Sequence, residues 1–405
     1  MHAVLLGAEQ EAIEELAGLG YDVTVLYVDH DRTVVQICED LVTHRAHLPS
    51  FDRPELAWGA LIHLGVVDDI DVIIPGHEFA VTTAAVLNGI LGLRTPMEPA
   101  VALAGRDKAL QKTLWAKHGV PTARFRVFPE KPSSKEELAE GLGDLVPPYV
   151  VKPVADGGTH LVFACESAEE LLDRLLANPE LEHFMVEERQ PGDEWHFDGT
   201  IADGRIEHFM VSRYLAPLIE TKAGSTLRSI ALPPRDHPEL YAEAREFAEA
   251  SRAALGGRWG VFHFEVFGRP GHFVAGELAW RPPGVLASLC ARQSVGVSLW
   301  AAHARLHAGE PVTAEAVSES AHGFVCLPVR PDFRNGVTQQ DIESIPGVRH
   351  VRMKVLPGQL MRGMNTSTTA VAWALVEGDD IDHCTRRIND AVRIVTEMHL
   401  DKSHP

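Results

Sequence analysis

The stretch Tyr149-Val-Val-Lys-Pro-Val-Ala-Asp-Gly-Gly-Thr-His160 carries the strongest fold signal in the sequence. It begins as an apolar strand with Lys152 in its middle. An ammonium group is unfavourable there unless an anion or polar group meets it, so Lys152 is a candidate phosphate ligand, or else a lysine that protects an edge strand. The glycine loop over 156–160 is either a plain turn or a loop whose backbone N–H groups bind phosphates. We expect a hairpin with a glycine tip and a second strand over 161–163.

Strands with acidic residues follow this hairpin. The segment 184–198 reads as a strand, a sharp turn that contains Pro191-Gly192, and a second strand, with a further strand over 207–211. Antiparallel pairing is the natural expectation for such closely spaced strands. A helix is expected over about 238–254.

A second predicted hairpin contains two glutamates. Its strands cover 261–267 and 272–278, and alternation places His263 and Glu265 on the face opposite the phenylalanines. Glu265 and Glu277 are 12 positions apart, so they share a face only if the connection has odd length or contains a bulge, for which Gly268 and Gly271 are suitable. Two carboxylates on one face could hold Mg²⁺ that also binds phosphate; the alternative is a solvated pair.

The first 95 residues read as a small doubly wound sheet. Val4–Gly7, Glu9–Leu19 and Val23–Tyr27 predict strand, helix and strand, and Asp71–Pro75 and Glu78–Leu91 add another strand and helix. A dinucleotide site is not expected, because the segment after Gly7 lacks the later glycines of that fingerprint and contains two glutamates.

Three helix starts are marked by capping residues. Asp107 begins a helix that carries Lys108 in its first turn. The segments Ser134-x-x-Glu137 and Ser167-x-x-Glu170 are capping boxes, which predict two further helices on either side of the glycine-tipped hairpin.

Composition excludes several classes of partner. The 405 residues contain 37 Lys plus Arg against 57 Asp plus Glu, a net charge of −20, which disfavours nucleic acid and anionic membranes. Apolar runs are far shorter than the roughly 20 residues of a membrane helix. The start lacks the basic leader of a signal peptide, and the five cysteines are scattered without any CxxC pair. We therefore expect a cytoplasmic protein with reduced thiols.

The ordered set of motifs resembles the ATP-grasp superfamily. The matching segments, which span about residues 100 to 285, are Asp107-Lys108, Val151-Lys-Pro-x-x-x-Gly-Gly158, Val186-Glu-Glu-x-x-x-Gly-x-Glu194, Phe264-Glu265 and Glu277-Leu-x-x-Arg281-Pro. The N-terminal sheet with Glu78-Phe-Ala looks like the pre-grasp domain of that superfamily. The resemblance implies an α/β and α+β protein: a pre-grasp domain over 1–100, an ATP-grasp domain over 101–310 with a lid over about 115–185, and an αβ extension over 311–405.

The resemblance also implies a role for each matching residue. Lys108 and Lys152 would contact the α- and β-phosphates of ATP, and the loop Asp156, Gly157, Gly158, Thr159 would close over the β- and γ-phosphates. Glu187 would lie by the adenine amino group, the backbone of Glu188, Arg189 and Gln190 would form the hinge, and Glu194 would bind the ribose. Glu265 and Glu277 would hold Mg²⁺, or Mn²⁺. Arg281 would stabilise the transferring phosphoryl group, and Arg228 is a second catalytic candidate.

The implied activity is an ATP-dependent carboxylate-amine ligase of the amino-acid ligase type, which forms an amide through an acyl phosphate and releases ADP and phosphate. One alternative is a carboxylating or formylating enzyme similar to those of the purine pathway. Another is a nucleotide-binding protein without turnover. Ala279 departs from the superfamily pattern, in which many members have Asn, and this leaves the number of Mg²⁺ ions open.

Small carboxylic acids and amines, with amino acids in both roles, are the expected partners, and a homodimer is a further expectation. The identity of the two substrates and the pathway are not decided by the sequence. Roles also stay open for charged residues outside the matching segments and for one histidine: His263, Arg213, Lys222, Arg352 and Arg362.

Overall fold

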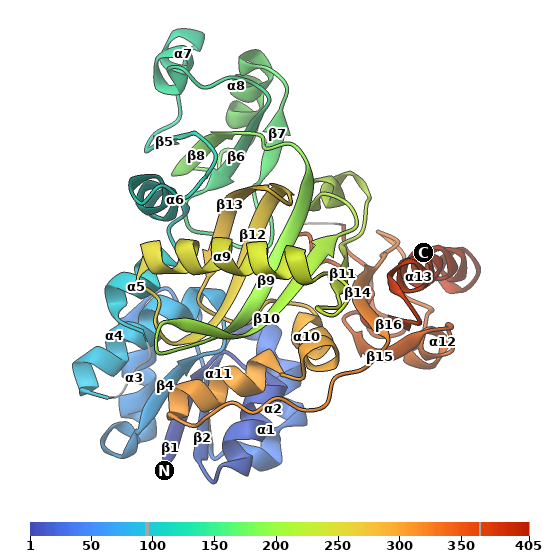
Figure 1. The fold of residues 1–405 in the computed structure, drawn as a ribbon. Coiled ribbons are helices and arrows are strands. Elements are labelled where there is room, and N and C mark those ends of the chain that lie inside the picture. Colours follow the sequence, from blue (N-terminus) through green and yellow to red (C-terminus); the bar gives the residue numbers. More distant parts are fainter. Residues whose placement is uncertain (94–96, 364–365, 405) are drawn as a thin grey trace.

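The N-terminal part of the computed structural model is a parallel sheet with strand order β3-β2-β1-β4, flanked by helices (Figure 1). Its elements are β1 (His2–Leu6), α1 (Gln10–Gly18), β2 (Asp22–Tyr27), α2 (Arg32–Ile37), β3 (His44–His47), α3 (Pro54–Leu64), β4 (Val72–Pro75), η4 (Glu78–Ala80) and α4 (Val81–Leu91). The predicted βαβ opening is confirmed. Strand β3 has no strand signal, because two of its four residues are histidines. The structure describes residues 1–93, 97–363 and 366–404.

A small lobe, called the lid lobe here, follows the linking helices α5 (Pro99–Ala104) and α6 (Lys108–Lys117). Its antiparallel sheet has the order β5-β8-β6-β7. The elements are β5 (Phe125–Phe128), α7 (Lys135–Leu142), β6 (Tyr149–Pro153), β7 (Phe163–Cys165), α8 (Ala168–Ala177) and β8 (Phe184–Glu188). The glycine-tipped hairpin β6–β7 is confirmed, but its second strand begins at Phe163, because Leu161 has a φ of +52° that does not fit a strand.

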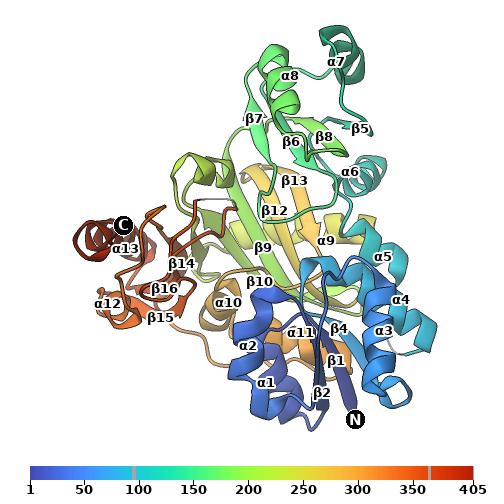
Figure 2. The same ribbon diagram turned by 180° about the vertical axis from the view of Figure 1, so that it is seen from behind.

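An eight-stranded sheet forms the centre of the molecule, with the order β13-β12-β9-β10-β11-β14-β16-β15 (Figure 2). The elements of its first part are β9 (Asp193–Ala202), β10 (Arg205–Tyr214), η5 (Leu218–Ala223), β11 (Arg228–Leu232), α9 (Pro238–Leu255), β12 (Gly260–Arg269) and β13 (His272–Ala279). Antiparallel pairing is confirmed for β9 with β10. It is wrong for β8 and β9, which belong to different sheets, so the turn at Pro191-Gly192 connects the lid lobe to the central sheet.

The C-terminal part extends this central sheet on its far edge. The far edge is built from β14 (Ala321–Leu327), α12 (Gln339–Glu343), β15 (Val348–Met353), β16 (Ala372–Gly378) and α13 (Ile381–Lys402). Two helices precede it: α10 (Ala287–Val295) packs against the central sheet, and α11 (Leu299–Ala308) packs against α1 of the N-terminal part. Strand β14 pairs with β11, so this region shares hydrogen bonds with the central sheet. The domain boundaries at 100 and 310 stay predictions. No helix in the described ranges is long and apolar enough to cross a membrane.

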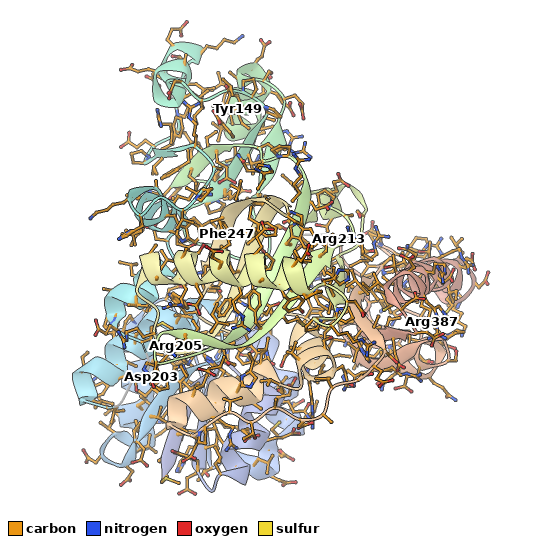
Figure 3. The ribbon with its side chains drawn as sticks, in the orientation of Figure 1. Tyr149, Asp203, Arg205, Arg213, Phe247 and Arg387 are labelled. Atoms are coloured by element: carbon orange, nitrogen blue, oxygen red, sulfur yellow. The ribbon has the colours of Figure 1, made fainter. Side chains whose placement is uncertain are left out.

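The central sheet has an apolar face, which packs on a hydrophobic core, and a polar face. Helix α9 covers the apolar face, and Phe247 on this helix stacks on Phe264 of β12 with ring centroids 5.7 Å apart (Figure 3). Because side chains alternate along a strand, His263 and Glu265 point to the opposite face. That face lies toward the lid lobe.

Candidate active site

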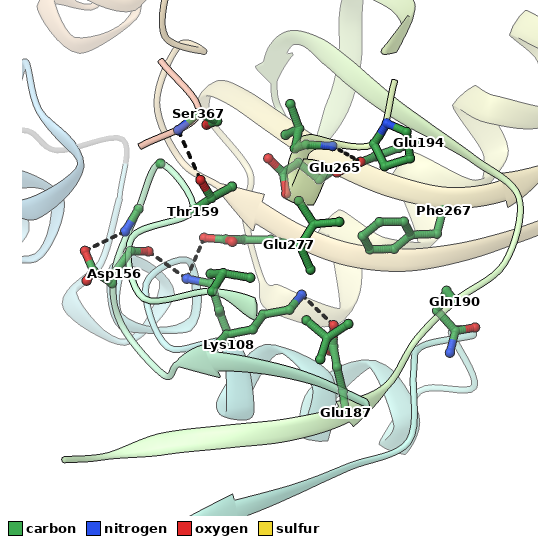
Figure 4. Close-up of a pocket in the computed structure, with 18 of the residues that line it drawn as sticks. Lys108, Asp156, Thr159, Glu187, Gln190, Glu194, Glu265, Phe267, Glu277 and Ser367 are labelled. Carbon is green, nitrogen blue, oxygen red and sulfur yellow. Dashed lines mark hydrogen bonds and ion pairs between the residues drawn. The ribbon is translucent and has the colours of Figure 1, made fainter. Parts of the chain in front are cut away.

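A cavity of about 630 Å³ lies between the lid lobe and the polar face of the central sheet (Figure 4). It brings together most of the predicted site residues, namely Lys108, Lys152, Asp156, Gly157, Gly158, Thr159, Glu187, Arg189, Gln190, Glu194, Glu265, Glu277 and Arg281. Two predicted residues do not line it. Glu188 turns outward and binds Arg124, which precedes β5, with 3.1 Å between Oε1 and Nη1, so only its backbone belongs to the connection between the lobes. Arg228 is the other.

Arg228 lies on β11, where its Nη1 donates to Oδ1 of Asn389 on α13 at 2.6 Å. Arg228 does not line the cavity, so the geometry gives no support to a catalytic role for it. Arg213 pairs with Asp193 at 3.7 Å, and Arg352 lies 4.0 Å from Glu9. Arg362 is exposed. The side chain of Lys222 lies outside the described residues.

Three lysines and two glutamates form a buried charge network at the lid side of the cavity. Lys152 Nζ lies 2.5 Å from one carboxylate oxygen of Glu187, and Lys112 Nζ lies 3.0 Å from the other. Burial alone would raise the pKa of Glu187, but the two ammonium groups lower this pKa to about 2. Lys108, the first residue of α6, reaches the backbone oxygen of Asp156 at 2.7 Å and Glu277 at 3.1 Å. The network keeps cationic groups at the cavity wall.

Lys112 is a site residue that the motif analysis missed. It stands four residues after Lys108 in the same helix, so both side chains lie on one helix face. That spacing is a usable signal, because two lysines on a buried helix face require anions.

The two glutamates of the second hairpin are directly opposite each other. Glu265 pairs with Glu277, and the register then shifts by one residue between Glu265 and Val266. The hairpin turn has an even length of two residues, Pro270 and Gly271, so the extra residue is Gly276 within β13. A shared face is confirmed, but the bulge is not at Gly268 or Gly271. A Cβ on Gly276 would come within 2.9 Å of the Glu265 carbonyl oxygen, so only glycine fits there without a shift.

Glu194 lies at the start of β9, beside this pair. Its Oε2 accepts a hydrogen bond from the backbone N–H of Leu218 at 2.8 Å. Burial, with the neighbouring Glu265 carboxylate as the second cause, raises the pKa of Glu194 to about 8. Glu194 therefore holds a proton at neutral pH, and a cation beside the two carboxylates would favour their charged forms.

A histidine network supports the polar face of β12. Asp198 is fully buried, and its two oxygens meet Nδ1 of His196 at 2.5 Å and Nδ1 of His263 at 2.6 Å. His196 Nε2 lies 2.7 Å from Ser229 Oγ. His263 Nε2 lies 3.8 Å from Glu265 Oε1. Although burial opposes it, Asp198 and Glu265 raise the pKa of His263 to about 9.

Arg281 is held by an ion pair with the N-terminal domain. Its Nε binds Oε2 of Glu78, and Arg106 Nη1 binds the other oxygen of Glu78 at 2.6 Å. Burial would raise the pKa of Glu78, but Arg281 and Arg106 lower this pKa to about 2. Arg106 is a second residue of the site that the sequence motifs do not indicate, and no spacing in the sequence marks it.

The glycine loop is tied to the C-terminal part. The backbone N–H of Ser367 donates to the carbonyl oxygen of Gly158 and to Oγ1 of Thr159, both at 3.1 Å. Thr159 has a φ of +60°, a conformation that few residues with a Cβ adopt. The loop thus covers the cavity between Lys108 and the C-terminal segment.

The residues present fit a metal-bound nucleoside triphosphate. Two opposed glutamates offer the oxygen ligands that Mg²⁺ prefers, and buried lysines and an arginine can neutralise phosphates. The cavity volume falls in the usual range for a small-molecule site, roughly 300–1,000 Å³. This arrangement suits phosphoryl transfer, which needs positioning and charge neutralisation.

Comparisons with known proteins agree with this geometry. No family model matches the chain. An L-arginine-specific L-amino acid ligase from Bacillus subtilis is 24% identical over 354 residues, which are 82% of each chain. A D-alanine–D-alanine ligase from Anaplasma centrale is 32% identical over 159 residues, 39% of this chain and 69% of that protein. The crystal structure of an L-amino acid ligase from Bacillus licheniformis superposes with a TM-score of 0.78 at 17% identity, covering 100% of this chain and 98% of the other.

The chain therefore belongs to the ATP-grasp carboxylate-amine ligases, enzymes that form C–N bonds. The ATP-grasp fold expected from the motifs, with a lid over a central sheet and an N-terminal α/β domain, is confirmed.

Proposed function

We propose that this chain is an ATP-dependent L-amino acid ligase that joins two amino acids through an acyl phosphate. The observation that carries the proposal is the convergence of Lys108, Lys152, Glu265, Glu277 and Arg281 on one cavity. The similarity to an L-arginine-specific L-amino acid ligase over most of both chains supports amino acids as the acid and the amine.

The reaction has two steps. A carboxylate oxygen of the first amino acid attacks the γ-phosphorus of ATP, and ADP leaves. The amino group of the second amino acid then attacks the acyl carbon, phosphate leaves with the electron pair of the C–O bond, and the amine loses a proton. A divalent ion, Mg²⁺ or Mn²⁺, held by Glu265 and Glu277 would neutralise phosphate charge.

The chain's own residues position these groups. Lys108 and Lys152 bind the phosphates in place of their present carboxylate partners, Glu277 and Glu187. Arg281 lines the cavity, is fixed by Glu78, and would stabilise the transferring phosphoryl group. The glycine loop covers the phosphates and excludes water. The adenine contact of Glu187 and the ribose contact of Glu194 stay predictions, as does the homodimer.

Two alternatives make different predictions. A carboxylating or formylating enzyme would need bicarbonate or formate in place of the acid. A nucleotide-binding protein without turnover would release no phosphate; the presence of both glutamates, Lys152 and Arg281 at the cavity argues against it.

The test is phosphate and ADP release with ATP and Mg²⁺ in pairwise mixtures of amino acids and small carboxylates, followed by mass spectrometry. We expect release that requires both partners and a product mass equal to their sum less water. Release with bicarbonate or formate alone as the acid would contradict the proposal.

Glu277→Ala is a site variant that tests whether the observed activity depends on this cavity. We expect it to abolish ADP formation while the melting temperature stays within a few degrees, because Glu277 is partly exposed at the cavity wall. Full activity of this variant would also contradict the proposal.

A further inference from the structure

Four positions form a square on the polar face of the hairpin β12–β13. Glu265 is opposite Glu277, and His263 is opposite Ala279. All four residues line the cavity. The methyl group of Ala279 offers no ligand atom, so His263 is the residue with a possible ligand atom at the end of the hairpin face beside Glu265. Three of the four corners thus carry groups that can bind a metal ion.

We propose that His263 Nε2 is a third protein ligand of the divalent cation that Glu265 and Glu277 hold. This inference rests on the proposed function, because it concerns the metal of the same nucleotide site. Nothing in the motif pattern assigns this role to a histidine.

The orientation of the ring supports the proposal. Asp198 Oδ1 accepts a hydrogen bond from Nδ1 of His263 at 2.6 Å, so Nδ1 keeps its proton and Nε2 is the nitrogen on the side of Glu265, where a metal ion would replace the Nε2 proton. A carboxylate that binds the far nitrogen of a histidine is the usual support of a metal-binding imidazole. Asp198 is itself fixed by His196, and both of these residues are fully buried.

The spacing also fits a shared ion. His263 Nε2 lies 3.8 Å from Glu265 Oε1. Two ligands at about 2.1 Å from one metal ion lie roughly 3 to 4 Å apart. Without a metal ion these two atoms form a long ion pair, and a divalent cation between them would take the place of the Nε2 proton.

A histidine ligand would change which metal the site prefers. Oxygen ligands suit Mg²⁺, whereas an imidazole ligand shifts preference toward first-row transition metals. The ratio of Mn²⁺ to Mg²⁺ affinity should therefore depend on His263.

The experiment is pulsed electron paramagnetic resonance on the full chain with Mn²⁺ and ADP. We expect a nitrogen coupling on the bound Mn²⁺ that changes when the protein is made with ¹⁵N-labelled histidine, which separates imidazole from adenine nitrogens. His263→Asn should remove this coupling. The same variant should lower the Mn²⁺ to Mg²⁺ affinity ratio, measured by calorimetry with ADP, by about tenfold.

His160→Asn is the matched control, because His160 is the other histidine that lines the cavity within the described residues. We expect it to keep the coupling. Unchanged ADP binding in EDTA shows that each variant is folded. Bound Mn²⁺ without histidine coupling in the wild-type protein would overturn this inference alone. No bound Mn²⁺ in the presence of ADP would overturn it together with the proposed function.

Discussion

At the scale of single residues, Glu78 links the N-terminal domain to the cavity. Its carboxylate binds Arg106 and Arg281 and is 7% exposed. We predict that Glu78→Gln lowers the free energy of unfolding by about 3 kcal/mol at pH 7, because the buried Arg106 and the partly buried Arg281 lose their carboxylate partner. It should also lower kcat, since Arg281 is no longer held. Urea unfolding and steady-state kinetics measure these effects.

The pH dependence gives an independent check on Glu78. The pKa of Glu78 is lowered to about 2 in the folded chain, from an ordinary 4.5. A lowered carboxyl pKa stabilises the fold above pH 4.5, and this stabilisation is lost as the pH falls toward 2. The stability difference between wild type and Glu78→Gln should therefore shrink between pH 4.5 and 2. A constant difference across that range would contradict the ion-pair explanation.

Single residues also show what the sequence can predict. Lys152 can be noted because it breaks an apolar strand pattern, but the roles of Lys152, Glu265 and Glu277 are predicted only by the ordered set of motifs to which they belong. Arg106 escapes prediction, because it acts through Glu78. Lys112 has one local signal, its spacing of four residues from Lys108, but its contact with Glu187 joins segments that are distant in the sequence. Local patterns carry no information on those contacts.

At the scale of elements, the bulge in β13 decides whether the two glutamates face each other. Gly276 is the extra residue, and a Cβ there would meet Phe267 at 2.8 Å and the Glu265 carbonyl oxygen at 2.9 Å. We predict that Gly276→Ala lowers stability by about 1–3 kcal/mol through overpacking. By moving Glu277 against Glu265 it should also weaken Mn²⁺ binding with ADP by about tenfold, as measured by calorimetry.

Gly271 provides the matched control for this prediction. It lies at the hairpin tip with φ +82°, and a Cβ at this position would meet no atom within 4 Å. Asn tolerates such a φ, so Gly271→Asn should leave metal binding unchanged. Equal losses in both variants would mean that the whole hairpin, and not the bulge, is sensitive.

Helices and strands with a clear hydrophobic period or a capping residue can be predicted from the sequence. The sheet to which a strand belongs cannot, because it depends on which distant strand pairs with it. Ser134 and Ser167 accept hydrogen bonds from Glu137 and Glu170 N–H groups and start α7 and α8 as expected. The strands β8 and β9 are also predictable. Their separation into two sheets is not, because a Pro-Gly turn looks the same whether it closes a hairpin or connects two lobes.

At the scale of the whole molecule, the cavity depends on contacts between three regions. The lid lobe supplies Lys152 and the glycine loop, the central sheet supplies the glutamates, and the C-terminal part supplies Ser367, whose N–H binds the loop. The motif order predicts the first two regions. The third contact joins residues more than two hundred positions apart and has no sequence signature.

The contact between Thr159 and Ser367 predicts how closure of the glycine loop over the cavity responds to a substitution of Thr159. Thr159→Val keeps the side-chain shape but removes the Oγ1 that accepts from the Ser367 N–H at 3.1 Å. A net loss of about 1 kcal/mol, roughly fivefold, is typical for such a hydrogen bond. We therefore expect KM for ATP to rise about fivefold and backbone amides of residues 156–162 to exchange hydrogen faster in the ADP complex. The second bond, from Ser367 to the Gly158 carbonyl, is kept and should hold the loop partly closed. If exchange stays unchanged while KM rises, Thr159 acts by direct contact with the nucleotide and not through closure, because only closure couples the loop to the C-terminal part.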